Sequence, residues 1–298
     1  MSKINSLIAE RMSLIKPSPT MAVSKLAAEM KAAGKDVIGL GAGEPDFDTP
    51  DHIKNAAITA IKNGETKYTA VDGTPALKKA IVNKFYKDNN IEYKIDEIIV
   101  SVGGKQVLFN ALMSSINPGD EVIIPAPFWV SYPDMVALAG GIPIIVEGKE
   151  SNNFKVIPDD IKNKISDKTK WIIINSPSNP TGSSYTKNEL KDLGNLLLNY
   201  EHIFIMSDDI YEKIIYDDFK FYSLAEVVPA LKDRILTVNG VSKAYAMTGW
   251  RIGYAGGPKE LISSMAKLQS QSTSNPSSIS QAAALAALEG PEEFLSER

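Results

Sequence analysis

The sequence contains no cysteine and only two histidines, His52 and His202, which lie far apart along the chain. Disulfide bonds and thiolate metal sites are therefore excluded, and a zinc site built on histidines is not expected. An excess of charge of one sign is also lacking, because 32 lysine and arginine residues nearly balance 36 aspartate and glutamate residues, leaving a net charge of −4. Nucleic-acid binding draws most of its affinity from contacts between basic residues and phosphates, so we expect no nucleic-acid partner.

Long hydrophobic runs are missing as well. The most apolar stretch, Met135 to Val146, is interrupted by Gly140, Gly141 and Pro143 and is too short to span a bilayer. The N-terminal segment MSKINSLIAERMSLIKPSPT has charges among its apolar positions and lacks the apolar core of a signal peptide. We therefore expect a cytoplasmic protein with no membrane partner.

Short apolar runs alternate with helix-like stretches through most of the sequence. The runs that predict buried strands are Glu97–Val102, Glu121–Ile124, Ile142–Val146, Trp171–Ile174, Ile203–Met206 and Ile235–Val238. This alternation is typical of an α/β fold, in which helices flank a mostly parallel central sheet. Ligands of such sheets bind at the carboxyl ends of the strands, so we expect a functional site in the loops that follow these runs.

The two ends of the sequence differ from this pattern. Residues 1–44 hold one amphipathic stretch, Met21 to Ala33, and predict an N-terminal arm with part of a small domain, whereas residues 45–298 predict one large domain. Near the other end, Gln281 to Glu289 is strongly helical, and Pro291 is suited to the first turn of a further helix. Because the sequence stops within that helix, we expect the chain to be part of a longer protein.

A lysine and an arginine follow the apolar run ILTVNG. Lys243 comes directly after the run, and a lysine at the end of a strand can lose solvation, lower its pKa and become a nucleophile for aldehydes. Most lysines beside a strand are, however, solvated surface residues. Arg251 stands in the apolar segment GWRIGY, where a guanidinium needs either a phosphate or an internal carboxylate as its partner. Both alternatives stay open for each residue.

Polar residues follow two further apolar runs. Asp208 and Tyr211, in SDDIYE, are compatible with metal binding, with helix capping, or with a carboxylate and a phenol that hold the nitrogen and the oxygen of a heterocycle. Asn179 lies in NSPSNPTG, where two prolines and a glycine fix a rigid turn that either presents the asparagine or is a plain connection.

Glycines join another run to a helix-like stretch. At Gly103-Gly104-Lys105 the missing side chains let backbone N–H groups at a helix start approach an anion. The pattern is not a Walker loop. The segment GLGAG is not the dinucleotide fingerprint either, because its spacing is wrong and Glu44-Pro45 follow where a helix should begin.

Together and in this order, the motifs resemble the class I aminotransferases of pyridoxal-phosphate (PLP) fold type I, and within them the bacterial aspartate/prephenate aminotransferase group. The resemblance covers essentially the whole chain. Its most specific strings are AGEPDFDTP (Ala42–Pro50), SPSNPTG (Ser176–Gly182), SDDIYE (Ser207–Glu212) and SKAYAMTGWRIGY (Ser242–Tyr254). It implies PLP as cofactor and transfer of an amino group between aspartate or glutamate and 2-oxo acids such as oxaloacetate and 2-oxoglutarate, with prephenate as a further candidate.

The resemblance also implies roles for single residues. Lys243 matches the lysine that binds PLP as an imine and moves the proton between substrate and cofactor. Asp208 matches the acid that pairs with the pyridine nitrogen, and Tyr211 and Asn179 match the groups that hydrogen-bond the ring oxygen. Trp129, in PFWVSY, matches the aromatic residue that stacks on the ring, although a tryptophan in such a run is otherwise core. The residues implied to hold the phosphate are Gly104, Lys105, Ser242, Arg251 and, from a neighbouring subunit, Tyr68. The last of these implies a homodimer with shared sites.

Substrate binding is implied for a further set of residues. Gly43 matches a glycine whose backbone faces the substrate, next to Trp129 and Asn179. Those expected to receive a distal carboxylate are Lys105, Lys16, Ser18 and Thr20, although the loop around Lys16 could equally be a rigid surface turn. The family's C-terminal segment, with an arginine that clamps the substrate's α-carboxylate, is missing from this sequence. We therefore expect this chain alone to keep the PLP pocket but to transaminate poorly.

Four other interpretations remain at this point. Two lie within PLP chemistry: another fold-type-I enzyme, such as a β-lyase or an aminocyclopropane-carboxylate-type synthase, and an inactive PLP-binding fragment. A third is a PLP-fold regulatory domain, for which the chain shows no spare DNA-binding module or basic patch. The fourth is a nucleotide-binding α/β protein, which would give no reason for Lys243.

Overall fold

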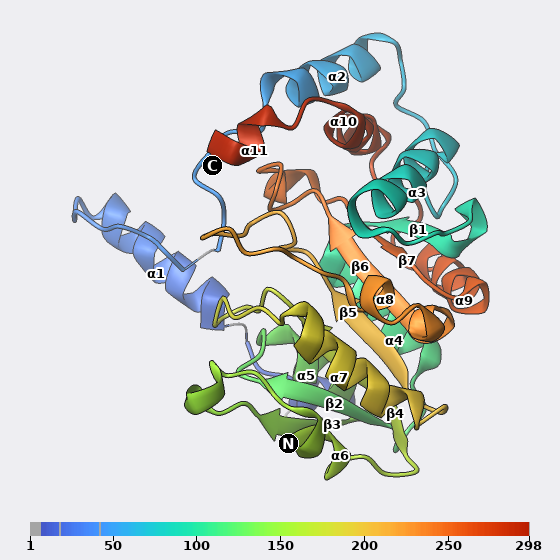
Figure 1. Ribbon diagram of the computed structural model, residues 1–298. Helices are drawn as coiled ribbons and strands as arrows, with labels where there is room; N and C mark the ends of the chain where they lie inside the picture. Colours follow the sequence, from blue (N-terminus) through green and yellow to red (C-terminus); the bar gives the residue numbers. More distant parts are fainter. Residues whose placement is uncertain (1–6, 18, 42, 298) are drawn as a thin grey trace.

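The computed structural model describes residues 7–17, 19–41 and 43–297, and its centre is one seven-stranded sheet (Figure 1). The strands are β1 (Ile98–Ser101), β2 (Glu121–Ala126), β3 (Ile142–Glu147), β4 (Thr169–Asn175), β5 (Phe204–Asp208), β6 (Ile235–Gly240) and β7 (Gly253–Gly256). Their order across the sheet is β1-β7-β6-β5-β4-β2-β3. Strand β7 runs antiparallel to both of its neighbours, and the other pairs are parallel.

Helices precede and connect these strands. The α-helices are α1 (Pro19–Ala32), α2 (Asp51–Lys62), α3 (Pro75–Asn89), α4 (Gly104–Ser115), α5 (Ser131–Leu138), α6 (Pro158–Lys162), α7 (Lys187–Leu198), α8 (Leu224–Val227), α9 (Lys259–Ser270), α10 (Ser278–Glu289) and α11 (Glu293–Glu297). Short 3-10 helices occupy Glu10–Leu14, Ile95–Glu97, Glu150–Asn152, Pro229–Arg234 and Thr248–Trp250.

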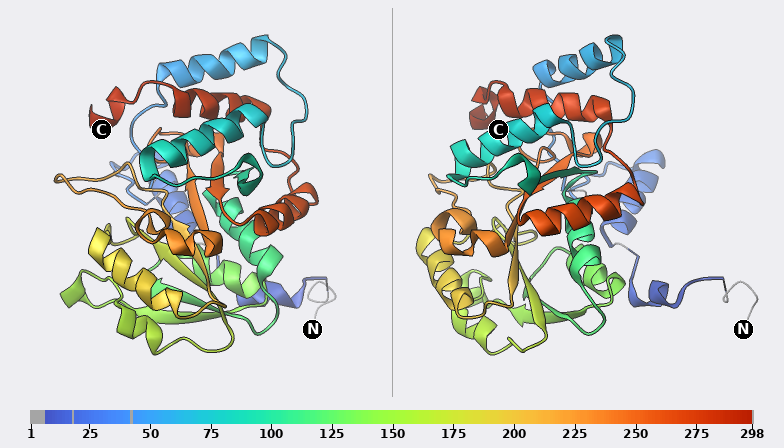
Figure 2. Two further views of the ribbon diagram at one scale, coloured as in Figure 1. Left: turned by 45° about the vertical axis from the view of Figure 1, so that its right-hand side comes forward. Right: turned by 90° about the vertical axis from the view of Figure 1, so that its right-hand side faces the viewer.

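Each face of the sheet carries its own hydrophobic core, and the period of two along the strands divides the side chains between them. In β4, Trp171 and Ile173 pack with α4, α5 and α9, whereas Ile172 and Ile174 pack on the opposite face with α3, α6 and α7. Helix α10 covers part of that second face and packs against α2 and α3 (Figure 2). Both faces are therefore buried, which explains why the strands read as continuous apolar runs.

The sequence prediction of an α/β fold with a mostly parallel sheet is confirmed. All six apolar runs are strands, and the helix-like stretches Met21 to Ala33 and Gln281 to Glu289 lie in α1 and α10. The expected helix at the end begins at Glu293, so Pro291 precedes its first turn rather than forming it. The adjacent Glu292, just before the helix, pairs with Lys213 at 2.5 Å.

Strand β7 had no counterpart in the sequence prediction. Two of its four residues are glycines, which have low strand propensity. They are required by close approach: a Cβ on Gly253 would lie 2.1 Å from the backbone nitrogen of Gly104, and one on Gly256 would lie 2.4 Å from the ring of Tyr93. Tertiary contacts, rather than local preference, therefore determine this strand.

The N-terminal arm, which we define as residues 7–41 of the described chain, is largely exposed. Helix α1 projects from the side of the molecule (Figure 1), and Leu40 after it is 89% exposed. The domain boundary between residues 44 and 45 stays a prediction.

Candidate active site

The carboxyl ends of β4, β5 and β6 meet at one cavity of about 610 Å³. Parallel pairing places Asn175, the last residue of β4, beside Asp208, the last residue of β5. The loop after β6 brings in Lys243, and the first turn of α4 closes one side. Among the residues lining the cavity are the predicted site residues Thr20, Gly43, Gly104, Lys105, Trp129, Asn179, Asp208, Tyr211, Ser242, Lys243 and Arg251.

Lys243 stands at the centre of this group. Its Nζ donates a hydrogen bond to the backbone carbonyl of Gly43 at 2.7 Å and lies 5.8 Å from the centre of the Tyr211 ring. Loss of solvent lowers the pKa of Lys243, and the positive charge of Arg251 lowers it further, while Glu44 and Asp208 act in the opposite direction. A lysine with a lowered pKa has more of the neutral, nucleophilic amine at neutral pH.

Asp208 is buried at the bottom of the cavity. Its Oδ2 accepts a hydrogen bond of 2.6 Å from the hydroxyl of Tyr132, and burial raises the pKa of the carboxyl to about 6. Its other oxygen, Oδ1, accepts a long bond of 3.4 Å from the backbone N–H of Ile210, so the residue ends a strand and does not cap a helix. A buried carboxylate whose donors are both neutral is suited to a cationic partner.

Tyr132 was not singled out by the sequence analysis. It lies on α5 three residues after Trp129, and it is fully buried, with its ring edge-on to that tryptophan at 5.4 Å. Burial, and then the charge of Asp208, raise the pKa of its hydroxyl, which keeps it a donor. The signal in the sequence was only its position in PFWVSY, because the partner Asp208 lies 76 residues away.

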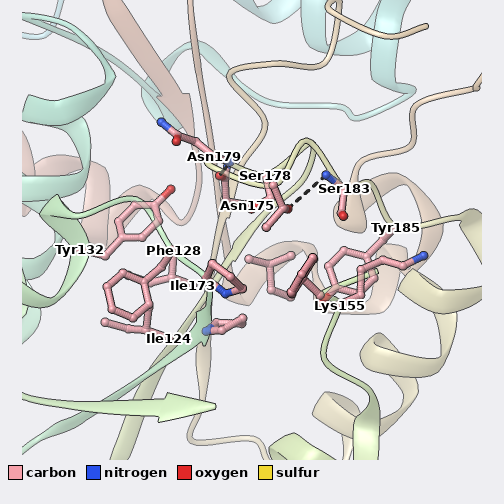
Figure 3. A pocket seen from close by; sticks show the side chains of 15 residues that line it. Ile124, Phe128, Tyr132, Lys155, Ile173, Asn175, Ser178, Asn179, Ser183 and Tyr185 are labelled. Atoms are coloured by element: carbon pink, nitrogen blue, oxygen red, sulfur yellow. Dashed lines mark hydrogen bonds between the residues drawn. The ribbon is translucent and has the colours of Figure 1, made fainter. Parts of the chain in front are cut away.

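Tyr211 and Asn179 form a second pair on the cavity wall. Burial and the charge of Asp208 raise the pKa of the Tyr211 phenol, and the neighbouring Asn179 side chain acts in the opposite direction. Both side chains come from loops that follow neighbouring parallel strands, β4 and β5. A smaller cavity of about 30 Å³ lies behind Asn179 and is lined also by Phe128 and Tyr185 (Figure 3).

The start of α4 and the loop before β7 form a cradle with the character of an anion site. Gly103 has φ +83°, and a Cβ there would lie 2.2 Å from a nitrogen of the Arg251 guanidinium. Arg251 donates to the carbonyl of Thr248 at 2.9 Å, and no carboxylate pairs with it among the described residues. The open N–H groups of the first helical turn and Ser242 face the same cavity. An internal carboxylate partner for Arg251, one of the two alternatives from the sequence, is therefore not present in this part of the chain.

Lys105 and Trp129 form the outer wall. The Lys105 Nζ lies 4.7 Å from the centre of the Trp129 ring, and burial followed by the charge of Arg251 lowers the pKa of the lysine. The cavity thus combines two cationic side chains, Lys105 and Arg251, with the amine of Lys243.

Three predicted site residues are not brought to this cavity by the described structure. Tyr68 is 91% exposed and Lys16 is also exposed, and neither lines the cavity. Ser18 lies outside the described residues. Their predicted roles stay predictions.

In residues 7–17, 19–41 and 43–297, no group of three or more acidic or histidine side chains is placed to hold a metal ion. No helix in this part of the chain has the length and apolar character needed to cross a membrane.

A lysine nucleophile, a buried carboxylate and an anion cradle in one cavity of a parallel sheet define an enzyme site for a phosphorylated heterocyclic aldehyde. The family model "Aminotransferase class I and II" matches residues 35–298, and the chain belongs to that family. Its class I members use pyridoxal phosphate. The family resemblance is confirmed, and the nucleotide-binding interpretation is wrong.

Known relatives agree with this assignment. A probable aspartate/prephenate aminotransferase of Rickettsia conorii is 62% identical over 290 residues, which cover 97% of this chain and 72% of that protein. The aspartate/prephenate aminotransferase of Cereibacter sphaeroides is 58% identical over 290 residues, with the same two coverages of 97% and 72%.

Solved structures are similar as well. The aspartate aminotransferase of Rhizobium meliloti superposes with a TM-score of 0.94 at 54% identity, covering 97% of this chain and 72% of that one. The aspartate aminotransferase of Thermus thermophilus with maleate has a TM-score of 0.92 at 44% identity, with coverages of 97% and 74%.

Proposed function

We propose that this site moves an amino group between a dicarboxylic amino acid, aspartate or glutamate, and a 2-oxo acid. The observation that supports this most directly is the arrangement of three side chains in one cavity: Lys243, the buried Asp208, and Arg251 without a carboxylate partner among the described residues. If Lys243 were only a solvated surface lysine and Arg251 only part of an internal ion pair, the two would have no reason to share a cavity with Asp208.

The residues fit pyridoxal phosphate. A dianionic phosphate suits the first turn of α4. The Arg251 guanidinium lies so close to Gly103 there that it leaves no space for a side chain at this position. Gly104, Lys105 and Ser242 would contact the same group, and Trp129 would cover the ring. When bound, the cofactor supplies an electron sink for the charge that develops when the α-hydrogen of the amino acid leaves.

The remaining chemistry belongs to the side chains. The Asp208 carboxylate would hold a positive charge at the ring nitrogen, and Tyr132 would orient that carboxylate through its hydrogen bond. The Lys243 amine, with its lowered pKa, would accept the proton from the substrate's α-carbon and deliver it to the aldehyde carbon of the cofactor, on the other side of the amino nitrogen. Asn179 and Tyr211 would hydrogen-bond the ring oxygen from the opposite edge of the cavity.

Preference for a second carboxylate rests on Lys105. Its ammonium lines the cavity next to Trp129, and Thr20 of the N-terminal arm lies on the same lining. An ammonium facing a dicarboxylate is electrostatically complementary. The Thermus thermophilus relative of known structure has maleate, a dicarboxylate, bound to it. Lys16 and Ser18 are proposed to join this group, and prephenate is a further candidate acceptor.

Steady-state kinetics test the proposal. We expect ping-pong kinetics with aspartate and 2-oxoglutarate, because the first substrate must leave as its 2-oxo acid, with its amino group retained on the cofactor, before the second substrate binds. Lys105→Ala should raise KM for dicarboxylic substrates by about tenfold or more, equivalent to about 1.4 kcal/mol, with a smaller effect on alanine. Release of pyruvate from a β-substituted amino acid without any 2-oxo acid would instead support the β-lyase alternative.

A homodimer with shared sites is part of the proposal. The N-terminal arm leaves many apolar side chains exposed: Leu7, Ile8, Met12, Leu14, Met21, Val23, Leu26, Ile38 and Leu40. An apolar surface of this extent is typical of an interface, and a second copy of the chain would cover it while bringing the exposed Tyr68 to the neighbouring phosphate cradle.

The chain spans 72% of the length of the Rickettsia conorii relative. That it transaminates poorly by itself stays a prediction, with an inactive PLP-binding fragment as the limiting case. A turnover number of this chain equal to that of the full-length Rhizobium meliloti relative would contradict it. A cytoplasmic location likewise stays a prediction.

A further inference from the structure

Asn175 has no role in the site as described so far, yet its side-chain amide joins two of the loops that form it. At the end of β4, its Nδ2 donates to the backbone carbonyl of Asp208 at 2.9 Å, and its Oδ1 accepts from the backbone N–H of Asn179 at 2.8 Å. We infer that Asn175 is a positioning residue, whose single amide sets the spacing between the carboxylate at one edge of the cofactor and the amide at the other. The inference rests on the proposed function.

The hydrogen bonds around Asn179 show how the Asn175 side-chain amide contributes to the position of this loop. Within the loop, Gly182 N–H bonds to the carbonyl of Ser178 at 2.8 Å, and Ser178 N–H bonds to the carbonyl of Ser183 at 2.9 Å. These bonds join the loop to itself, and the Ser183 hydroxyl ties its far end to the carbonyl of Asn153 at 2.5 Å. The bond from the Asn179 backbone N–H to Asn175 joins the loop to the sheet at the same residue whose side chain faces Tyr211.

The space around Asn175 makes packing a weak substitute for these bonds. Asn175 lines the large cavity on one side and the small cavity of about 30 Å³ on the other, and Figure 3 shows it next to Asn179 at the edge of the latter. Between these two cavities, the Asn175 amide is held by its hydrogen bonds to the backbones of Asp208 and Asn179. Loss of both bonds would let Asn179 shift relative to Asp208, while the Ser183 end of the loop stays tied to Asn153.

A shift of this kind has a chemical consequence that a purely structural role lacks. Asn179 and Tyr211 would donate hydrogen bonds to the ring oxygen of the bound cofactor, and such donors favour the oxygen's anionic form. A displacement of about 1 Å is enough to weaken a hydrogen bond severely. The deprotonated form of the bound cofactor then becomes less favourable, and the midpoint pH of its visible absorbance change rises.

The first experiment is a pH titration of the visible absorbance of the PLP-loaded chain carrying Asn175→Leu. Leucine keeps the approximate volume but makes neither bond. We expect the midpoint to rise by at least about 0.5 pH units, in the same direction as in Asn179→Ala. A midpoint equal to that of the wild type would overturn the inference. Asn175→Ser, whose hydroxyl is too short to reach both partners, carries the same measurement if the leucine variant does not fold.

A double-mutant cycle separates indirect from direct action. If Asn175 acts on the ring oxygen only through Asn179, then Asn175→Leu adds no shift in the Asn179→Ala background. A full additional shift there would show that Asn175 acts by another route. Asn110→Leu is the matched control, because Asn110 of α4 also has a hydrogen-bonded side-chain amide, which donates to Gln269 at 3.0 Å. Its loss should lower Tm without moving the midpoint of the absorbance change.

A cofactor-free measurement keeps this inference separate from the proposed function. The backbone N–H hydrogen of Asn179 should exchange at least about tenfold faster in Asn175→Leu than in the wild-type chain, because its acceptor, the Asn175 Oδ1, is gone. Unchanged exchange would overturn the inference. A wild-type chain that shows no visible band with added PLP would contradict the proposed function, while the exchange measurement would still test Asn175.

Discussion

At the scale of the residue, the site depends on charges held partly out of water. Asp208 is buried with one phenolic donor, Lys243 loses solvent beside Arg251, and the pKa values of both move toward neutrality. Each shift costs folding free energy in the cofactor-free chain and is offset when a complementary charge enters the cavity. The pH dependence of the cofactor-free chain therefore reports on the site.

The first prediction concerns Asp208. Its folded pKa of about 6 lies above the roughly 3.9 expected in the unfolded chain, so the folded state retains the proton between these values. The contribution of this group to the free energy of unfolding is full below pH 4 and is lost as the pH rises through 6. We expect the stability of Asp208→Asn relative to the wild type to increase over this range by roughly 2–3 kcal/mol. Urea unfolding of the cofactor-free proteins at a series of pH values measures it, and a pH-independent difference would contradict it.

A second prediction concerns Gly103. An alanine there would place its Cβ against the Arg251 guanidinium and displace it from the anion cradle. We expect PLP to bind at least about tenfold more weakly, a loss of about 1.4 kcal/mol. Gly119→Ala is the matched control, because Gly119 also has a positive φ, of +93°, but open space around it. Fluorescence titration of both variants with PLP decides the matter: equal affinities in the two variants would exclude the proposed steric effect.

At the scale of the element, strand ends and buried contacts determine which loops come together. The sequence predicts six of the strands, because their apolar runs are continuous, and thereby places Asp208, Asn179 and Lys243 at one sheet edge. It could not find β7 or the bond from Tyr132 to Asp208, because both depend on contacts between residues distant in sequence. Tyr68 is 91% exposed because its predicted role lies in the site of a neighbouring subunit, and Lys16, predicted to receive the distal carboxylate, is exposed as well.

A buried ion pair under the Tyr211 loop gives a prediction at this scale. Lys84 of α3 pairs with Glu212 and bonds Asn89 at 2.7 Å, with both charges almost fully buried. Lys84→Met leaves the carboxylate without its cation and should lower the free energy of unfolding by about 3–5 kcal/mol. Lys84→Met with Glu212→Leu should recover a large part of this loss. Lys54→Met, which removes an exposed pair with Asp51, is the control and should have little effect. Chemical denaturation compares the four proteins, and a Lys84 effect as small as the Lys54 effect would be inconsistent with a buried pair.

At the scale of the whole molecule, the exposed arm and Tyr68 lead to a prediction about subunits. If Tyr68 completes the phosphate cradle of a second copy, a mixture of Tyr68→Ala and Lys243→Ala chains forms some dimers with one intact site. The experiment uses a full-length relative in which the two changes are made in separate chains. Each variant alone should be nearly inactive. Denaturing and refolding the two variants together should restore up to about a quarter of that relative's wild-type activity. Absence of any recovery, with dimers present by sedimentation, would contradict shared sites.

The central claim is that Lys243 forms the covalent bond to pyridoxal phosphate in this cavity. Reduction of the PLP-loaded chain with borohydride, followed by peptide mass spectrometry, tests it most directly. We predict one modified peptide, with the cofactor's mass on Lys243, and no modification in Lys243→Ala. Labelling of another lysine in the wild-type chain, or no labelling at all with excess cofactor, would contradict the account.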